Sequence, residues 1–226
     1  MPPEPPAGGP CRSTVFIVDD HPVFREGLAR IINREKDLVV CGEATDAVET
    51  LHRAETLKPD LVVIDISLEG TNGIGLARSL RSRLPETRLL VVSMYSESLY
   101  GERALRAGAD GYVMKRESGR KLLAAMRHVL AGNTHVSQDL NESILRKLSG
   151  RGRRATGPAV ERLSDRELEV FELIGQGFGT REIAERLNVS MKTVETHREH
   201  IKEKLNVERT AELVQRAIHW IHHDKP

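Results

Sequence analysis

The chain has 226 residues, a net charge of +1, 30% charged residues and only 4% aromatic residues. This length suits two domains joined by a linker. No stretch approaches the roughly 20 consecutive apolar residues of a membrane span, and the N-terminus lacks the basic start and apolar run of a secretory signal. We therefore expect a cytoplasmic protein without membrane contacts. The two cysteines, Cys11 and Cys41, do not indicate a disulfide or a metal site.

Short apolar runs alternate five times with segments of helical periodicity between residues 14 and 131. The apolar runs predict strands at 14–18, 38–41, 61–64, 88–92 and 111–114. The segments between them predict helices at 23–32, 47–57, 74–84, 99–107 and 122–130. Most strands are apolar at consecutive positions, as strands covered by helices on both faces must be. We expect a doubly wound, five-stranded parallel α/β sheet of the flavodoxin-like kind.

The alternation of apolar runs and helical segments stops after Gly132. Residues 141–148 have the pattern of a short helix, and a stretch rich in Gly, Arg and Pro follows it. From residue 163 onward the pattern is helical, with breaks at 175–179, 188–190 and 206–208, which predicts four short helices. Ser164 and Glu167 form a capping box at the start of the first helix, and Thr180 and Ser190 are the expected caps of the second and third.

These changes divide the chain into four parts. We expect a disordered tail (1–12), an α/β domain (13–132), a linker with a potential short helix (133–160) and an all-α four-helix domain (161–226). A basic cluster lies in the linker, and it contains Arg146, Lys147, Arg151, Arg153 and Arg154. This cluster is either a solvated linker or an additional phosphate contact, and its composition favours the linker.

Three carboxylates follow two of the predicted strands. Asp19 and Asp20 end the first strand, and Asp65 ends the third. Ligands of an open α/β sheet bind at this edge, near the point where the strand order reverses. Carboxylates that converge there repel one another unless a divalent cation lies among them, and hard oxygen ligands suit Mg²⁺. With the ion in place, Asp65 can attack a phosphorus centre.

Two further strands end in residues that suit a phosphoryl group. Ser93 ends the fourth strand and Lys115 the fifth, so a hydroxyl and an ammonium are expected in the same crevice. Each residue alone has an ordinary explanation as a helix cap, a turn former or a solvated side chain. The joint arrangement at the ends of four strands favours a functional site.

The sequences VDDHPVFREGL, VIDISLEGTNGI, LLVVSMYSE and ADGYVMK resemble the four signature regions of response-regulator receiver domains, over about residues 14 to 131. The resemblance implies Asp65 as the phosphoacceptor. It implies Asp20, Asp65 and the Ser67 carbonyl as ligands of Mg²⁺, with Asp19 acting through water. It further implies Ser93 and Lys115 as phosphoryl-binding residues and Tyr112 as an aromatic switch. One departure is Glu69, which stands where the family usually has proline.

Two other functions are compatible with parts of this pattern. A phosphohydrolase of the haloacid-dehalogenase kind also has a nucleophilic aspartate after a buried strand, but it needs a second aspartate two residues later, where this chain has Ser67. A receiver fold that never takes up phosphate usually lacks one of the acids or the lysine. All three acids and the lysine are present here. We therefore expect a regulator rather than an enzyme.

The segment REIAERLNVSMKTVETHREHIKEKL has the order helix, short turn, helix of a DNA-binding helix-turn-helix. With its flanks, from residue 163 to 220, it resembles the NarL/LuxR class of regulators, also called NarL/FixJ. The alternative is a plain four-helix bundle with a charged face. Net charge gives no support for nucleic acid binding, because from Pro158 onward there are eleven Lys and Arg against thirteen Asp and Glu.

The expected DNA-contacting face lies on the third helix of this domain. Its residues are Lys192, Thr193, Glu195, Thr196, His197, Arg198, Glu199 and Lys202, followed by Lys204. Seven apolar residues are expected in the core, namely Ile183, Ala184, Leu187, Val189, Val194, Ile201 and Leu205. The fourth helix, at 210–222, carries more apolar surface than a small domain can readily bury, and in the family this helix pairs two subunits.

The combined resemblance implies a two-component response regulator. Such a protein is phosphorylated on aspartate by a sensor histidine kinase, which promotes homodimerisation and sequence-specific binding to double-stranded DNA. RNA polymerase is a further expected partner. We therefore predict regulation of transcription, with Mg²⁺ as the cofactor.

Overall fold

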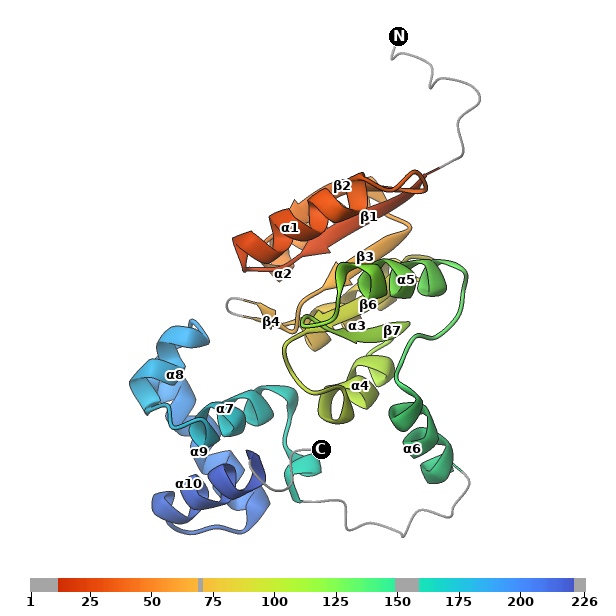
Figure 1. The fold of residues 1–226 in the computed structure, drawn as a ribbon. Coiled ribbons are helices and arrows are strands. Elements are labelled where there is room, and N and C mark those ends of the chain that lie inside the picture. Colours follow the sequence, from red (N-terminus) through yellow and green to blue (C-terminus); the bar gives the residue numbers. More distant parts are fainter. Residues whose placement is uncertain (1–11, 69–70, 149–158, 222–226) are drawn as a thin grey trace.

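The computed structural model describes residues 12–68, 71–148 and 159–221. An α/β domain is followed by one further helix and then by a group of helices near the C-terminal end (Figure 1). Several features discussed above lie outside the described residues. They are the tail up to Cys11, Glu69 in the loop after Asp65, and the arginines at 151, 153 and 154.

Five parallel strands form one sheet in the order β2-β1-β3-β6-β7. Their bounds are β1 (Ser13–Val18), β2 (Leu38–Ala44), β3 (Leu61–Ile64), β6 (Arg88–Ser93) and β7 (Gly111–Met114). These are the five predicted strands, and the doubly wound fold is confirmed. The strand order reverses between β1 and β3, so the ligand crevice of this fold lies at their carboxyl ends. A two-stranded antiparallel pair, β4 (Ser67–Leu68) and β5 (Thr71–Asn72), follows β3.

Helices cover both faces of the sheet. One face packs against α1 (Pro22–Asn33) and α5 (Gly119–Leu130), and the other against α2 (Ala47–Leu57), α3 (Gly73–Arg83) and α4 (Glu97–Arg106). Strand residues alternate between these two cores, with Val15 and Ile17 on the first side and Phe16 and Val18 on the second. Consecutive apolar residues in each strand are needed for this arrangement.

Capping residues set where the helices begin. Asn72 caps α3 by accepting a hydrogen bond from the Ile74 amide at 2.8 Å, and Ser118 caps α5 by accepting one from Lys121. The predicted starts of α3, α4 and α5 lie one to three residues later than the observed starts. The prediction placed each helix start at its first apolar residue. The observed helices begin earlier, directly after a capping residue that precedes the buried face.

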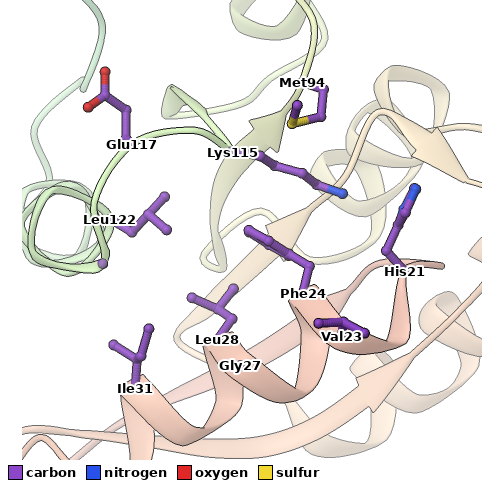
Figure 2. Close-up of a pocket in the computed structure, with 11 residues that line it drawn as sticks. His21, Val23, Phe24, Gly27, Leu28, Ile31, Met94, Lys115, Glu117 and Leu122 are labelled. Atoms are coloured by element: carbon purple, nitrogen blue, oxygen red, sulfur yellow. The ribbon is translucent and has the colours of Figure 1, made fainter.

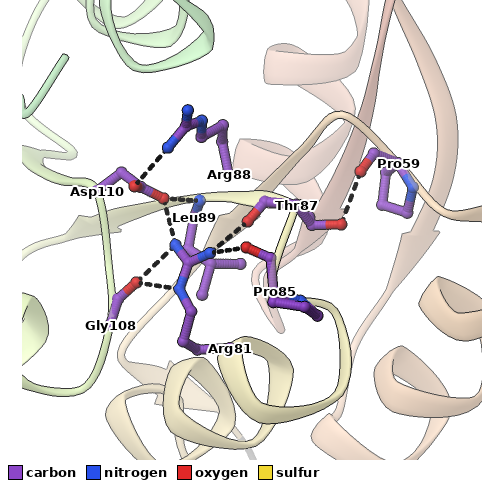
Figure 3. A network of polar contacts seen from close by, with 8 residues as sticks. All are labelled: Pro59, Arg81, Pro85, Thr87, Arg88, Leu89, Gly108 and Asp110. Carbon is purple, nitrogen blue, oxygen red and sulfur yellow. Dashed lines mark hydrogen bonds and ion pairs between the residues drawn. The ribbon is translucent and has the colours of Figure 1, made fainter. Parts of the chain in front are cut away.

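An arginine cluster closes the edge of the sheet opposite the crevice (Figure 3). The Arg81 guanidinium on α3 donates to the carbonyls of Gly108, Pro85 and Thr87 and pairs with Asp110. The Asp110 carboxylate also accepts from the Leu89 amide at 2.8 Å. These contacts join α3, β6 and the loop before β7, and they hold the amino ends of the strands together.

The segment after α5 stays attached to the α/β domain. His135 pairs with Gly111 beside β7, where the Tyr112 amide donates to the His135 carbonyl at 2.8 Å and the His135 amide donates to the Asp110 carbonyl at 3.0 Å. Helix α6 (Gln138–Leu148) then packs on α4, and its Leu140 side chain fills the space above Gly101. The predicted short helix in this segment exists, and it begins three residues earlier than predicted.

The C-terminal part consists of a short 3₁₀ turn, η1 (Ala159–Arg162), and four helices, α7 (Asp165–Gly175), α8 (Thr180–Arg186), α9 (Met191–Leu205) and α10 (Thr210–His219). The capping box of Ser164 and Glu167 is present, and Ser190 caps α9. Thr180 is not the cap of α8, which is a correction to the prediction. The Glu182 carboxylate accepts a hydrogen bond from the Gly179 amide at 2.8 Å. Gly179, the residue before Thr180, is therefore the N-cap of α8.

The core of the helical part agrees with the predicted set. Ile183, Ala184, Leu187, Val194, Ile201 and Leu205 are buried, and Val189 is partly buried against them. These residues are continuous with the apolar core between the sheet and α2, α3 and α4. None of the helices in the described part of the chain is both long enough and apolar enough to cross a membrane.

Candidate functional site

The predicted acidic site forms at the carboxyl ends of the strands. Asp19 and Asp65 directly follow β1 and β3, and Lys115 directly follows β7. The Lys115 ammonium lies 2.8 Å from an Asp19 oxygen and 2.7 Å from an Asp65 oxygen. Three residues that are far apart in the sequence therefore form one charged cluster, at the edge where the strand order reverses.

Burial raises the free energy of the ionised carboxylates in this cluster. The Asp19 and Asp65 residues are each 2% exposed. Burial and the nearby carboxylates of Asp19 and Asp20 raise the pKa of Asp65 to about 7, although Lys115 acts in the opposite direction. The Lys115 ammonium is shared by the carboxylates of Asp19 and Asp65, and Asp20 lies beside them. The negative charge of the site therefore exceeds its positive charge, which favours binding of a further cation.

The donor atoms fit a divalent cation. Asp19, Asp20, Asp65 and His21 each offer a ligand atom, and these atoms all lie within 4.8 Å of one another. The Oδ1 atom of Asp20 is buried and accepts no hydrogen bond within the described residues, and the His21 ring nitrogen lies beside it at 2.6 Å. Carboxylate oxygens of this kind suit Mg²⁺. Ser67, whose carbonyl is the remaining predicted ligand, begins β4 two residues after Asp65.

The predicted switch residues contact one another through Tyr95. Ser93 is fully buried, and its hydroxyl accepts from the Tyr95 amide at 3.2 Å. The Tyr112 hydroxyl is turned inward and donates to the Tyr95 carbonyl at 2.8 Å. The Tyr95 ring in turn stacks on Tyr100 of α4, with 4.9 Å between the ring centroids. A chain of contacts thus runs from the end of β6 to α4.

An apolar groove of about 630 Å³ opens beside the acidic cluster (Figure 2). Phe24, Leu28 and Ile31 of α1 form one wall, and Leu122 of α5 contributes to the other. His21 and Lys115 lie at the end of the groove nearest to the carboxylates. Apolar side chains at its mouth are well exposed, with Val23 at 87% and Met94 at 67%.

Helix α9 presents the predicted DNA-contacting residues. Lys192, Glu195, Thr196 and Glu199 are exposed, whereas Thr193, His197, Arg198, Lys202 and Lys204 are half-buried. The opposite side of the helix buries Val194, Ile201 and Leu205. The buried side of α9 therefore contains the predicted core residues, whereas four of the nine predicted DNA contacts are exposed and five are half-buried.

Several of these polar side chains have partners inside the chain. Lys202 pairs with Glu199 at 2.8 Å, and Lys204 pairs with Glu167 of α7 at 2.6 Å. The Arg198 guanidinium lies 3.3 Å from the Thr180 hydroxyl. The Lys204 ammonium is therefore held toward α7, whereas Lys192 at the start of α9 is exposed.

The apolar residues of α10 are divided between two environments. Leu213 and Ala217 are buried against the other helices, and Trp220, which follows the helix, contacts Phe171. Ile218 remains 40% exposed, and Val214 is half-buried. The helix thus contributes to its own domain and still leaves apolar surface uncovered.

The sequence analysis did not identify several residues that the fold brings to functional positions. His21 adds a ring nitrogen to the acidic cluster, and its place directly after Asp19 and Asp20 is a signal that could have identified it. Tyr95 and Tyr100 link the switch residues to α4. Asn72 and Glu169 form a contact between β5 and α7, and no local pattern indicates a contact between residues so far apart in the chain.

Comparison with protein families agrees with both halves of the chain. A model described as "Response regulator receiver domain" matches residues 15–127, and a model described as "Bacterial regulatory proteins, luxR family" matches residues 161–217. The oxygen regulatory protein NreC of Staphylococcus carnosus (strain TM300) is 36% identical over 208 residues, which cover 90% of this chain and 96% of that protein. NreC of Staphylococcus aureus (strain JH9) gives the same values.

The fold of the chain is also similar to solved structures of response regulators. A LuxR-family two-component response regulator from Aurantimonas sp. SI85-9A1 is 35% identical, with a TM-score of 0.56 over 61% of this chain and 99% of that chain. RcsB from Salmonella enterica serovar Typhimurium, bound to the promoter rprA in the presence of the phosphomimetic BeF3-, is 26% identical. Its TM-score is 0.59, over 90% of this chain and 97% of that chain.

Proposed function

Because the chain belongs to the LuxR family of two-component response regulators, which control transcription, we propose that phosphorylation of Asp65 by a histidine kinase drives its dimerisation and its binding to specific DNA. The observation that carries this proposal is the contact of Asp65 with Lys115 at 2.7 Å, beside Asp19 and Asp20. The proposed domains are those expected from the sequence, with the receiver at 13–132 and the DNA-binding domain at 161–226. The proposed compartment is the cytoplasm, and RNA polymerase is a further proposed partner.

The Asp65 carboxylate is the nucleophile in this proposal. One of its oxygens forms a bond to the phosphorus of a phosphohistidine as the bond from phosphorus to the imidazole nitrogen breaks, and the imidazole takes up a proton. Lys115 holds a phosphoryl oxygen by charge, and the Ser93 hydroxyl donates to another. Asp20, Asp65 and the Ser67 carbonyl would hold Mg²⁺, with Asp19 acting through water, and the bound ion would supply charge neutralisation at the transferring group.

The groove beside the acidic cluster supports the proposed kinase partner. Asp65 is 2% exposed, so a phosphohistidine must approach it past the residues at the rim. His21 and Met94 form part of that rim, and the exposed Val23 lies next to them on α1. Exposed apolar side chains around a buried reactive carboxylate suit the transient docking of another protein.

Labelling by a small phosphodonor tests the phosphorylation site. With Mg²⁺ present, the wild-type chain is expected to gain an acid-stable, alkali-labile label, and Asp65→Asn is expected to gain none. Asp20→Asn is expected to label poorly, because it lacks one of the metal ligands. Asp60→Asn is a matched control, since its carboxylate binds Thr14 at the other end of the sheet and takes no part in the cluster. Full labelling of Asp65→Asn would disprove the assignment.

The DNA-binding proposal rests on the exposed residues of α9 and on the promoter complex of the similar protein RcsB. The proposed contacts are Lys192, Thr193, Glu195, Thr196, His197, Arg198, Glu199, Lys202 and Lys204. Cations among them bind phosphates, whereas Glu195 and Thr196 read base edges. Dimerisation through the uncovered apolar surface of α10 then requires two half-sites related by symmetry.

Selection of bound sequences from random DNA, at two salt concentrations, tests these roles. Replacement of Lys192 by Ala is expected to weaken binding to all sequences equally and to lower the salt slope by about one unit. Replacement of Thr196 by Ala is expected to change the preferred base pair at one position of each half-site, by about 1 to 3 kcal/mol. An unchanged motif for both Thr196→Ala and Glu195→Ala would mean that α9 is docked differently.

A further inference from the structure

The first helix of the DNA-binding domain, α7, contacts the receiver directly. The Asn72 amide on β5 donates to the Glu169 carboxylate, and the Tyr100 hydroxyl on α4 donates to the Glu172 carboxylate at 3.3 Å. Arg103 of α4 donates to the Leu163 carbonyl at 2.7 Å and pairs with Asp165 at 2.9 Å. One face of α7 is thus held by two elements of the receiver, β5 and α4.

Two carboxyl groups at this contact are buried, and they lie one helical turn apart. Glu169 is 1% exposed and Glu172 is 0% exposed. The Arg166 guanidinium reaches Glu169 at 2.8 Å, and Asp165 adds negative charge on the same helix. Buried carboxylates at this spacing repel each other, and the charge of Glu172 adds to burial in raising the pKa of Glu169.

The receiver offers these carboxyl groups mostly neutral partners. Asn72 on β5 does not titrate, and the aromatic groups that face α7 are Tyr100 of α4, Tyr95 after β6 and Tyr112 of β7. Burial raises the pKa of each of these tyrosines above its usual value, so all three stay uncharged. Arg103 is the cation of α4 at this contact, and it pairs with Asp165.

We propose that the contact between α7 and the receiver is an acid-closed latch, in which the Glu169 and Glu172 pair takes up a proton when the domains close and releases it when they open. In the open state, α7 turns this face to water and the Glu169 carboxyl group ionises more readily. The charge of the pair thus decides how firmly the domains hold each other. Protonation lets the receiver hold α7, and ionisation releases α7.

The latch lies close to the proposed phosphorylation site. Gly73, next to Asn72, packs so tightly on the loop after β3 that a Cβ atom there would collide with the Asp65 carbonyl oxygen. The Gly73 amide also donates to the Ile66 carbonyl at 2.8 Å. A backbone shift at Asp65 therefore reaches Asn72 and its bond to Glu169. The effect of the latch on DNA binding rests on the proposed function, whereas the closure itself does not.

The direction of the pH dependence follows from linkage. Burial raises the pKa of Glu169 to about 7 in the closed state, although Arg166 opposes this rise. A group whose pKa is raised on closure stabilises the closed state at low pH, and this stabilisation is lost as the pH rises through the closed-state pKa. The ratio of closed to open molecules is expected to fall roughly tenfold between pH 6 and pH 8.

Small-angle X-ray scattering of the full-length, unphosphorylated chain measures this ratio. The wild-type chain is expected to expand as the pH rises from 6 to 8. Glu169→Gln keeps the acceptor for Asn72 but cannot ionise, so this variant is expected to stay compact at every pH. Glu172→Gln is expected to behave in the same way and provides a second test if one variant fails to fold. Glu185→Gln, at a side chain on α8 that is 65% exposed, removes an equal charge and is expected to follow the wild type.

Two results would overturn the latch. In one, the wild type and both glutamine variants expand equally, which would assign the pH dependence to other groups such as the histidines. In the other, the wild type does not expand, or becomes more compact, as the pH rises. No phosphodonor is used, so the outcome does not depend on phosphorylation of Asp65. Failure of the labelling experiment alone would disprove the proposed function and leave the latch intact.

Discussion

Two clusters of buried carboxyl groups lie in this molecule, and their neighbours give them different chemistry. Asp19 and Asp65 share the Lys115 ammonium, which is itself buried. Glu169 and Glu172 face an amide and a tyrosine hydroxyl of another domain. Burial raises the pKa of one carboxyl group to about 7 in each cluster. The receiver cluster brings four ligand atoms within 4.8 Å of one another and suits a cation, whereas the α7 cluster suits a proton. Burial raises the free energy of ionised carboxylates in both clusters. The neighbouring groups of each cluster determine whether this free energy is lowered by a cation or by a proton.

Removal of the cation from each cluster is the strongest test of this contrast. Lys115→Met is expected to lower the free energy of unfolding by about 3 kcal/mol without divalent ions, because two buried carboxylates lose their shared partner. Arg166→Met is expected to lower it by only about 1 kcal/mol, since Glu169 can take up a proton instead. Urea unfolding followed by circular dichroism measures both losses.

Added Mg²⁺ separates the two clusters further. Millimolar MgCl₂ is expected to restore much of the stability of Lys115→Met, because the acidic cluster accepts the ion in place of the ammonium. The same addition is expected to leave Arg166→Met unchanged. Equal losses in the two variants, with no difference on adding the ion, would contradict the distinction between the clusters.

A smaller effect is expected at the edge of the α7 contact. Arg103→Ala removes the hydrogen bonds to Leu163 and Asp165 and leaves both glutamates in place. These charged hydrogen bonds stabilise the closed state by about 1.5 kcal/mol, so their loss is expected to raise the fraction of open molecules about tenfold at any pH. Hydrogen exchange of the α7 amides measures this change. Arg106→Ala is the matched control, because the Arg106 side chain on the same helix is 75% exposed and pairs with Glu102. If the two variants exchange alike, Arg103 does not hold the domains together.

The smallest effect concerns the cap of α7. Ser164→Ala is expected to lower the free energy of unfolding by about 1 kcal/mol, because the Glu167 amide loses its acceptor. Thr180→Ala provides the comparison, since Gly179 and Glu182 form the cap of α8 without the threonine. Thermal unfolding of both variants checks this. A larger loss for Thr180→Ala would contradict the observed cap.

Much of the receiver could be predicted from the sequence because its pattern is local. The strands are apolar runs of four or more residues, and the acids, Ser93 and Lys115 directly follow strands, so a parallel sheet brings them to one edge. The helix-turn-helix follows in the same way from its turn and from the buried spacing of Val194, Ile201 and Leu205. Family comparison confirms both parts.

The contact between domains could not be predicted, because no local pattern encodes it. Glu169 and Glu172 have the composition of an exposed helix face, yet both are buried and contact the receiver. Asn72 has a local function as the cap of α3, which gives no sign of its second contact. The error at Thr180 has a related cause. A threonine is a common cap, but the side chain of Glu182 fixed the helix start one residue earlier.

The pairing of His135 with Gly111 also has a consequence for solubility. The last strand of an open sheet has free backbone groups that can recruit strands from other molecules and start aggregation. Here the Tyr112 amide is already bound to the His135 carbonyl, and α6 then continues over α4. The connecting segment therefore protects this border of the sheet. A cut or truncation before His135 is expected to expose β7 and to make the receiver prone to self-association.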